Sequence, residues 1–488
     1  MELYIEDILK ATGGSLVKGD KQVIINGVST DTRAINEGEI FFALVGKRFD
    51  GHCFISNLKE KGVVGAIVNR DWEGGSALEE SLPGLCIISV DDTLDALGDT
   101  ARFWRDKYPV PLVAVSGSCG KTTTKEMIAT ILGMNLTVHK TEGNKNNLIG
   151  LPLTILGLED SHQIAVVELG ISEREEMTRL AEISKPDVAL LTNIGVAHMS
   201  TLGGIEEVAR AKSELFAMLK PDGIEVVNLD DPWVVKMVDK SHRRRVTYSL
   251  NRGGDVRLKG CEVDDLSPDR LIARFSVYNN DIVIKINSIG THNLYNAAAA
   301  IATASALGIG CRDIAEGLSR FIPMKGRMEL LKLGNITVLD DTYNASPESV
   351  EVALKTLSTF FWRKIAVLGD MLELGDTARD IHKWIGTMVC RMGIDLLIVY
   401  GDFKEEVYDG AVSEGMASGC VHRVASKDDI VNILENNMRD GDVILVKGSR
   451  AAGMEDVVEK LKLTIKNTAN RFHEKDSDKL QIKKSECR

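Results

Sequence analysis

Short apolar runs separated by glycine and acidic residues fill the first part of the chain. KQVIINGV, EIFFALVG, GAIVN and LCIISV each have the length and composition of a strand. Glycine and acidic clusters between them are typical of turns. This alternation predicts a small α/β domain over residues 1–107.

A different pattern begins after Tyr108, where VPLVAVSGSCGKTTTKEMIATILG predicts a buried strand, a glycine loop and a helix. QIAVVELG and PDVALLTNIG follow as nearly continuous apolar runs, which are typical of parallel strands buried on both faces. The helical stretch THNLYNAAAAIATASALG then leads into FIPMKGRME, whose proline indicates a joint. We therefore expect a central nucleotide-binding domain over residues 108–324.

The alternation of strands and helices starts again after this joint. ITVLDD, KIAVLGD, LLIVYGD and VILVKGS, separated by helical segments, predict an open, Rossmann-like sheet over residues 325–466. Residues 467–488 are highly charged and nearly free of apolar periodicity, so we predict a flexible tail. The expected fold is α/β with three domains: a small N-terminal α/β domain, a central P-loop-type parallel sheet, and the C-terminal open sheet.

Composition narrows the class of protein. The chain is 44% hydrophobic and 27% charged, as in ordinary globular enzymes, and its eight cysteines are too scattered for a zinc or redox motif. A net charge of -12 argues against a surface for nucleic acid or anionic lipid. No apolar run approaches the roughly 20 residues that span a bilayer, and MELYIEDILKATGG is unlike a signal peptide. We expect a cytoplasmic protein with reduced thiols and no membrane insertion.

The segment GSCGKTTT carries the strongest chemical signal. Gly117 and Gly120 allow backbone N–H groups to converge on phosphates at a helix N-terminus, where Lys121 can reach the terminal phosphates and Thr122 can bind magnesium. Val115 occupies the position where the full P-loop pattern has another glycine, so this is the shorter G-x-x-G-K-T form. A chance glycine turn before a helix is the alternative, which the flanking strand and helix disfavour. The loop residues predicted to bind nucleotide are Gly117, Ser118, Cys119, Gly120, Lys121, Thr122 and Thr123.

Two further polar residues follow neighbouring predicted strands. Glu168 closes IAVVELG, and His198 follows the next strand in NIGVAHMS. Because the carboxyl ends of parallel strands open onto one crevice, both could bind the metal beside the phosphate loop. Taken alone, each could equally be a cap partner or a satisfied loop histidine.

Lys212 lies on the apolar face of a predicted helix, IEEVARAKSELFAML, beside Val208 and Phe216. Burial would lower the pKa of its amine, and the neutral amine could capture carbon dioxide as a carbamate that binds magnesium. The alternative, favoured by sequence chemistry alone, is a lysine that buries its stem and reaches water or a glutamate.

Together, GSCGKTTT, VVELG, NIGVAHMS with ARAKSELF, GTHNLYNAAAA, KGRME and LDDTYNASPES resemble the Mur ligase family over nearly the whole chain. The resemblance implies three domains, for a uridine nucleotide, ATP and the incoming amino acid or dipeptide, and an ATP-dependent amide ligation through an acyl phosphate. It implies two magnesium ions held by Thr122, Glu168, His198 and a carbamylated Lys212, which reverses the preference stated above. It also places Asn293 and Asn296 near adenine, Arg327 on the phosphates and Asp341 beside the ribose, with Lys121, Lys212, His198 and Arg327 as the groups that act in catalysis.

Two segments resemble those of one branch of the family. TEGNKNNLIGLPLT, with Asn144 and Asn147, and DDTYNASPES look like segments of the members that add D-alanyl-D-alanine to UDP-N-acetylmuramoyl-tripeptide in peptidoglycan precursor synthesis. In the second segment Ser346 is a natural N-cap before Pro347, and turn chemistry is the alternative role for Asp340 and Asp341. The region STDTRAINEGEIFFALVGKRFDGHCFI resembles a site for the uridine diphosphate, with Ser29, Thr30, Asp31, Arg33 and Lys47 as candidates.

Lys447, Ser449 and Arg450 follow the strand VILVK in the third domain. There they could hold the carboxylate of the dipeptide, and a capped helix with surface charges is an equally favoured alternative.

Alternatives remain at the level of substrate and class. Folylpolyglutamate synthase and the diamino-acid-adding Mur ligase share the phosphate loop and differ in the substrate domain. A P-loop NTPase that couples hydrolysis to movement or partner binding would turn over ATP without any acceptor. We expect a monomer, and the pattern leaves open the general base and the choice of lysine or diaminopimelate in the tripeptide.

Overall fold

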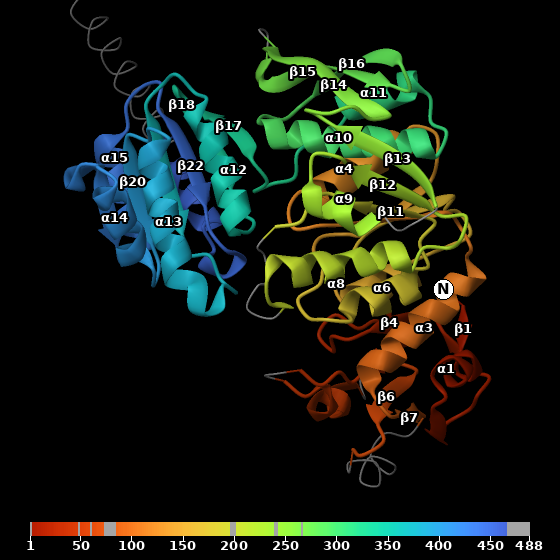
Figure 1. Cartoon of the computed structure of the whole chain (residues 1–488). Coiled ribbons are helices and arrows are strands. Elements are labelled where there is room, and N and C mark those ends of the chain that lie inside the picture. Colours follow the sequence, from red (N-terminus) through yellow and green to blue (C-terminus); the bar gives the residue numbers. More distant parts are fainter. Residues whose placement is uncertain are drawn as a thin grey trace, which may run out of the picture.

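The chain folds into three α/β units that follow one another along the sequence (Figure 1). This computed structural model describes residues 2–46, 49–58, 61–72, 84–195, 202–238, 243–264 and 267–465. The predicted α/β class and three-domain architecture are confirmed. Within these ranges, no helix has both the length and the apolar character needed to cross a membrane.

The N-terminal unit is built on a five-stranded sheet of order β2-β7-β6-β5-β4, in which only the β2–β7 pair is antiparallel. Its last helix, α3, begins after Asp92, whose Oδ1 accepts hydrogen bonds from two backbone N–H groups of the first turn. The buried Trp104 of α3 donates to the carbonyl of Leu158 in the central unit at 3.0 Å, so the two units share a core. The elements are β1 (Leu3–Tyr4), α1 (Ile5–Thr12), β2 (Ser15–Lys18), β3 (Ile24–Ile25), β4 (Gly27–Ser29), β5 (Glu39–Phe42), η1 (Gly51–Leu58), β6 (Gly65–Asn69), β7 (Cys86–Val90) and α3 (Thr93–Lys107).

The central unit contains a nine-stranded sheet of order β16-β15-β14-β13-β12-β11-β8-β10-β9. Helices α4, α10 and α11 cover one face of it, and α5, α6, α8 and α9 cover the other (Figure 1). The parallel strands are β8 (Leu112–Ser116), β9 (Val138–Lys140), β10 (Ile164–Glu168), β11 (Val188–Leu191), β12 (Ile224–Asn228) and β13 (Arg244–Ser249). The helices are α4 (Lys121–Leu132), α5 (Gly150–Leu156), α6 (Glu176–Ser184), α8 (Ile205–Ala217), α9 (Pro232–Val238), α10 (Thr291–Ala306) and α11 (Cys311–Ser319).

Three strands that the sequence analysis did not predict extend this sheet. They are β14 (Val256–Asp264), β15 (Ser267–Val277) and β16 (Asn280–Ile286), and their mutual pairing is antiparallel. In β16, Ile282, Ile284 and Ile286 are buried while the residues between them are exposed, the alternation expected of a sheet with one solvated face. None of their residues lines the cavity beside the nucleotide loop, and they complete the core beneath α10 and α11.

The C-terminal unit is a six-stranded sheet of order β17-β18-β22-β19-β20-β21, parallel except for β17. Ser346 caps α12 and Pro347 opens it, as predicted. The elements are β17 (Glu329–Leu333), β18 (Ile336–Asp341), α12 (Pro347–Ser358), β19 (Lys364–Gly369), η2 (Gly375–Thr377), α13 (Ala378–Arg391), β20 (Leu396–Tyr400), α14 (Lys404–Ser413), η3 (Ser418–Cys420), β21 (Val421–Val424), α15 (Lys427–Asn437), β22 (Val443–Lys447), η4 (Arg450–Ala452) and a helix over 455–465.

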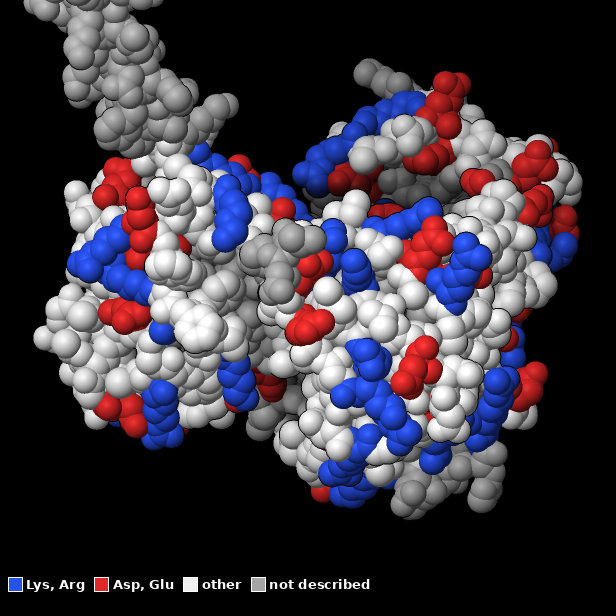
Figure 2. All heavy atoms as spheres, turned by 90° about the horizontal axis from the view of Figure 1, so that it is seen from above, with Lys and Arg blue, Asp and Glu red and all other residues white. Residues whose placement is uncertain are grey.

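The C-terminal unit forms a separate lobe, with acidic and basic side chains interspersed on the face shown in Figure 2. The chain enters this lobe through a joint in which Gly326 and Met328 both have positive φ, at 71° and 53°. The N–H of Met328 donates to Asp341 Oδ1 at 3.1 Å, which fixes the joint against β18. Arg327, between these two residues, is therefore held in a defined direction.

Candidate active site

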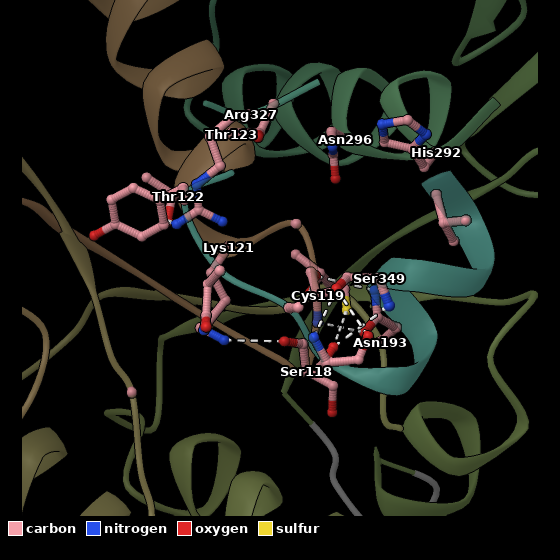
Figure 3. A pocket seen from close by; sticks show the side chains of 18 of the residues that line it. Ser118, Cys119, Lys121, Thr122, Thr123, Asn193, His292, Asn296, Arg327 and Ser349 are labelled. Carbon is pink, nitrogen blue, oxygen red and sulfur yellow. Dashed lines mark hydrogen bonds between the residues drawn. The ribbon is translucent and has the colours of Figure 1, made fainter. Parts of the chain in front are cut away.

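A cavity of about 880 Å³ lies where the central unit faces the C-terminal unit (Figure 3). Its central wall is formed by the phosphate loop, the carboxyl ends of β10 and β12 and the start of α10. Its other wall is formed by the joint and by the loops that follow β18, β19 and β22. Any ligand that fills this cavity touches both units.

The phosphate loop joins β8 to α4 as predicted, with Gly120 at the N-cap of the helix. Lys121 Nζ donates to the carbonyls of Gly117 and Ser118 at 2.9 and 3.1 Å, so the ammonium lies over the loop (Figure 3). Asn193, after β11, accepts from the N–H of Cys119 and donates to its carbonyl, at 2.9 and 3.0 Å. The loop thus has a fixed shape and faces the cavity with a helix N-terminus and a cation, which favours phosphate.

The two loop glycines have no room for a side chain. Gly120 has a φ of 82°, and a Cβ there would lie 2.3 Å from Asn296 Oδ1. We expect Gly120→Ala to abolish nucleotide binding and to destabilise the fold by about 1–3 kcal/mol. Isothermal titration with ADP and thermal unfolding measure the two effects. Gly253→Ala is the control, because a Cβ at Gly253 meets nothing within 4 Å, and equal behaviour of the two variants would contradict the expectation.

Glu168, at the end of β10, has the environment of a metal ligand. It is 2% exposed, its Oε1 accepts from Asn146 Nδ2 at 2.8 Å, and its buried Oε2 has no hydrogen-bond partner among the described residues. Thr122, also buried, lines the same cavity. A carboxylate and a hydroxyl oxygen suit magnesium, so the two residues fit the predicted ion.

The complete predicted metal set is not assembled in the described part of the chain. His198 lies outside the described residues, and within them no three His, Cys, Asp or Glu side chains form a group that could hold a metal. Magnesium binding by Thr122, Glu168, His198 and Lys212 therefore stays a prediction.

The predicted burial of Lys212 is confirmed. Its side chain is 1% exposed, and its Nζ donates to the carbonyl of Gly117 at 3.3 Å, the same carbonyl that Lys121 contacts. Burial, reinforced by the charge of Lys121, lowers the pKa of Lys212 to about 7. The amine does not reach water, so the interpretation as a lysine that extends to solvent does not hold.

Asn293 and Asn296 lie side by side on α10 and line the cavity. Asn296 accepts from the Thr124 hydroxyl at 3.2 Å, which joins α10 to α4, and Asn293 donates to Ser288 Oγ at 2.6 Å. The neighbouring His292 is half-buried, and the desolvation of its ring lowers its pKa to about 4, so the ring is neutral at pH 7. Contact of the asparagines with adenine remains a prediction.

Arg327 reaches from the C-terminal unit to the phosphate-loop helix. Its Nη2 donates to Thr122 Oγ1 at 3.1 Å, and its guanidinium carbon lies 4.0 Å from the ring centre of Tyr343. Its Nε is buried without a hydrogen-bond partner among the described residues. The stacked guanidinium is thus placed beside the phosphate loop, as its predicted role requires.

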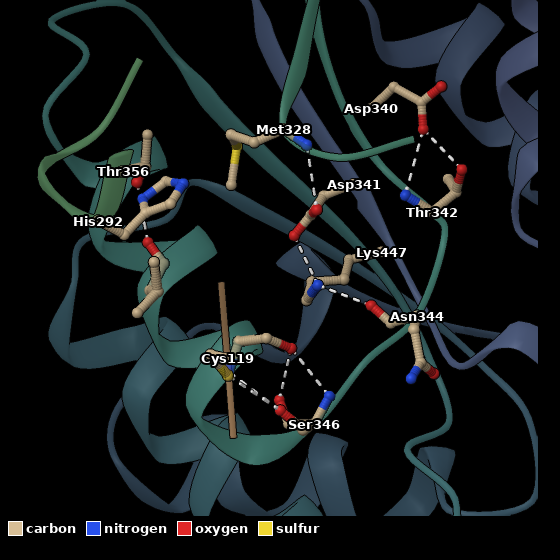
Figure 4. Close-up of polar contacts among 12 residues, drawn as sticks. Cys119, His292, Met328, Asp340, Asp341, Thr342, Asn344, Ser346, Thr356 and Lys447 are labelled. Carbon is tan, nitrogen blue, oxygen red and sulfur yellow. Dashed lines mark hydrogen bonds and ion pairs between the residues drawn. The ribbon is translucent and has the colours of Figure 1, made fainter. Parts of the chain in front are cut away.

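The acids at the end of β18 have different environments (Figure 4). Asp340 is fully buried and accepts from the N–H and hydroxyl of Thr342 at 3.2 and 2.6 Å, so it follows the turn-chemistry alternative. Asp341 lines the cavity and forms an ion pair with Lys447 at 2.5 Å. Lys447 is 2% exposed and also donates to the carbonyl of Asn344, so its buried ammonium is held by two partners from the end of β18 and the loop after it.

The other predicted substrate residues are placed as follows. Asn144, Asn147, Ser449 and Arg450 all line the cavity. Asn147 Oδ1 accepts from the N–H groups of Ile149 and Gly150 just before and at the start of α5, and Arg450 pairs with Glu455 at 2.9 Å. Their substrate contacts remain predictions.

The candidates for the uridine diphosphate lie in the N-terminal unit and do not line this cavity. Arg33 pairs with Asp31 at 2.7 Å and its side chain is 89% exposed, while Ser29 Oγ donates to the carbonyl of Asp31. Thr30 lies in the same turn, and Lys47 lies outside the described residues. Nothing in these contacts tests the predicted role.

Sequence reasoning missed three residues that shape the site. Asn146 orients Glu168, Asn193 fixes the phosphate loop, and Tyr343 stacks on Arg327. Asn193 follows a buried strand, like Glu168, and the same argument would have found it. The partners of Asn146 and Tyr343 are set by tertiary contacts that no local pattern reveals.

Comparison with known proteins places the chain among relatives of known activity. Residues 24–105, 115–304 and 326–450 match, in that order, the models of the Mur ligase family catalytic domain, the Mur ligase middle domain and the Mur ligase glutamate ligase domain. The UDP-N-acetylmuramoyl-tripeptide–D-alanyl-D-alanine ligase of Bacillus subtilis (strain 168) is 35% identical over 461 residues, which cover 94% of this chain and 98% of that protein.

Solved structures agree with the sequence comparison. A crystal structure of MurF from Acinetobacter baumannii has a TM-score of 0.86 at 30% identity and covers 95% of this chain and 99% of that one. A crystal structure of the MurF ligase from Thermotoga maritima in complex with ADP has a TM-score of 0.80 at 29% identity, with coverages of 91% and 98%. Because this likeness in sequence and structure extends over more than nine tenths of its length, the chain belongs to the Mur ligase family.

Proposed function

We propose that this chain is the ATP-dependent ligase that joins D-alanyl-D-alanine to UDP-N-acetylmuramoyl-tripeptide, giving the pentapeptide, ADP and phosphate. The observation that carries the proposal is the cavity whose phosphate loop and facing arginine come from different units. A phosphoryl donor bound at the phosphate loop can meet an acceptor in this cavity only when residues of both units surround the two molecules. The Bacillus subtilis relative, which matches 94% of this chain, is named for the joining of this substrate pair, and this supports the proposal.

The proposed chemistry begins with activation of the tripeptide carboxylate. Lys121 and Arg327 face the region where charge grows as the γ-phosphoryl group moves, and they would stabilise that charge. Magnesium held by Thr122, Glu168, His198 and a carbamate on Lys212 would neutralise the crowded phosphate oxygens. The dipeptide amine then attacks the acyl carbon and phosphate leaves. Holding the reactants in one cavity in near-attack geometry can supply about 7–11 kcal/mol of the barrier.

A regulatory P-loop NTPase is less well supported. Such a protein needs a water beside the γ-phosphate and no acceptor site, whereas here the loops after β19 and β22 of a second unit form the opposite wall of the cavity. We also propose that the enzyme acts as a monomer in the cytoplasm, because all its described cysteines are free thiols and the described residues that line the cavity come from one chain.

The proposal predicts the path of one oxygen atom. With ¹⁸O in the terminal carboxyl group of the tripeptide, one labelled oxygen is expected in the released phosphate, because the acyl–oxygen bond breaks when the amine attacks. Mass spectrometry of the phosphate measures the label. Unlabelled phosphate formed alongside pentapeptide would exclude the acyl phosphate.

The choice of acceptor and tripeptide needs a separate experiment. With ATP and magnesium, lysine- and diaminopimelate-containing precursors are each offered D-alanyl-D-alanine or single amino acids, and product mass is followed together with phosphate release. Steady ATP hydrolysis without any joined product would favour the NTPase.

A further inference from the structure

We propose that Lys125 is a positioning residue for Glu168, because its buried ammonium anchors the loop that holds this metal-binding candidate. The inference deepens the proposed function and rests on the part of it that gives Glu168 a magnesium ion to bind. Lys125 lies on the second turn of α4, one turn after Lys121. It belongs neither to the nucleotide residues nor to the metal residues discussed above.

The side chain of Lys125 is completely buried between polar partners. Its Nζ donates to the carbonyl of Thr141 and pairs with Glu126 Oε1 at 2.7 Å. A buried charge costs free energy, and an apolar side chain of similar size is often no less stable in place of a buried ion pair. Glu126 has a second counterion, because its Oε2 pairs with Lys140 at 2.6 Å. What Lys125 adds beyond this ion pair is its contact with Thr141.

Thr141, which follows β9, connects Lys125 to the backbone of Glu168. It is completely buried, and its carbonyl is the group that Lys125 contacts. Its N–H donates to the carbonyl of Val166 in β10 at 3.1 Å, and its Oγ1 accepts from the N–H of Glu168 at 3.0 Å. Thr141 is thus hydrogen-bonded to α4 on one side and to the end of β10 on the other. A shift of Thr141 would move the backbone from which the Glu168 carboxylate extends.

The loop that starts at Thr141 also holds the side chain of Glu168. Asn146 Nδ2 donates to Glu168 Oε1 at 2.8 Å. The carbonyl of Asn146 accepts from the N–H of Gly170 at 2.8 Å, which keeps the loop against the residues after β10. One segment, residues 141–146, therefore holds both the backbone and the carboxylate of Glu168, and Lys125 anchors the first residue of that segment.

The helix that carries Lys125 also carries Thr122, the other residue that fits magnesium, on its first turn. The contact between Lys125 and Thr141 therefore fixes where the Glu168 carboxylate lies relative to the Thr122 hydroxyl. Residues that orient metal ligands without touching the ion typically change metal affinity by about 10–100-fold when they are replaced. We expect an effect of this size from the loss of the Lys125 ammonium.

The test measures metal affinity separately from activity. Mn²⁺ is the probe, and its Kd in the complex of the enzyme with ADP is measured by electron paramagnetic resonance of the free ion. For Lys125→Met we expect this Kd to rise about 10-fold or more. The Kd for ADP without metal should stay unchanged, because the phosphate loop keeps its own contacts. An unchanged Kd for Mn²⁺ would overturn the inference, and so would an equal loss of affinity for metal-free ADP.

Two further variants separate the ion pair from the contact with Thr141. Glu126→Gln removes the charge beside Lys125 and leaves the contact with Thr141, so Mn²⁺ should bind as it does to the wild type. Equal weakening in Glu126→Gln and Lys125→Met would assign the effect to the ion pair and overturn the inference. Thr141→Val removes the acceptor of the Glu168 N–H and should also weaken Mn²⁺ binding. It tests the same connection if Lys125→Met does not fold, and wild-type affinity in Thr141→Val would overturn the inference.

A double substitution distinguishes failure of this inference from failure of the proposed metal site. Glu168→Gln should itself weaken Mn²⁺ binding, and adding Lys125→Met should weaken it by less than about 2-fold more, because Lys125 acts through Glu168. Effects that multiply independently would overturn the role of Lys125 alone. If Glu168→Gln binds Mn²⁺ as the wild type does, Glu168 is not a metal ligand, and both the proposed metal site and this inference are wrong.

Discussion

Replacing Lys121 by alanine is expected to lower the rate of ligation by roughly 10³-fold or more. The ammonium lies over the phosphate loop, 2.9 and 3.1 Å from two loop carbonyl oxygens, where a γ-phosphate would approach. Cations in this position stabilise charge that develops on the transferred phosphoryl group, and no other described lysine is hydrogen-bonded to both of these carbonyls. Hydroxylamine trapping of the acyl phosphate measures the affected step directly.

The fold should survive this substitution. Lys121 is partly exposed and its described contacts are with the loop alone, so thermal unfolding should shift little. Lys259→Ala, an exposed lysine on β14 far from the cavity, controls for the loss of a charge. A Lys121→Ala enzyme that ligates at the native rate would exclude the phosphate-loop role.

Replacing Lys212 by alanine is expected to abolish ligation, and short carboxylates such as acetate or propionate are expected to restore part of it. The substitution leaves a buried space beside Gly117 that a small carboxylate can enter to replace the carbamate oxygens. Lys212→Arg is the matched control, because a guanidinium stays charged and cannot form a carbamate. Absence of rescue, together with an unmodified mass for Lys212 in the active protein, would reject the carbamate.

The same residue predicts a pH dependence. The pKa of Lys212 is lowered from 10.5 to about 7, so the amine is mostly neutral above pH 7 and mostly protonated below it. Only the neutral amine reacts with carbon dioxide. At limiting bicarbonate, activity should therefore fall as the pH drops through about 7, and added bicarbonate should offset the loss. A profile that does not respond to bicarbonate would contradict this.

The parts of the site that were predictable depend on local patterns. GSCGKTTT predicts its loop because the two glycines permit the tight turn between the preceding strand and the following helix. Lys212 is predicted to be buried because its helical neighbours are apolar. The capped start of α12 follows from Ser346 and Pro347 in the same way. In each case the residues that determine the outcome lie within one or two helical turns of one another.

The parts that could not be predicted depend on distant contacts. The ion pair of Lys447 with Asp341, 106 positions away, has no local signal, and the predicted contact of Lys447 with the dipeptide carboxylate stays a prediction. Asn146 contacts Glu168, and Tyr343 contacts Arg327, only after the strands and units that carry them have packed together. Strands β14 to β16 were missed because a solvated antiparallel extension has a weaker apolar signal than fully buried parallel strands such as β8, β10 and β11.

The hydrogen bond from Arg327 to Thr122 joins the two walls of the cavity through one residue of each. A ligand that contacts both walls stabilises the arrangement of the two units in which the Arg327–Thr122 bond is made. A second ligand that also contacts both walls then binds more tightly, because the units are already in the arrangement that it needs. Thermodynamic linkage makes this effect reciprocal. Affinities measured for one ligand at a time should therefore underestimate those of the complete set, and inhibitor screens run without the natural ligands would overlook compounds that bind only when the Arg327–Thr122 bond is made.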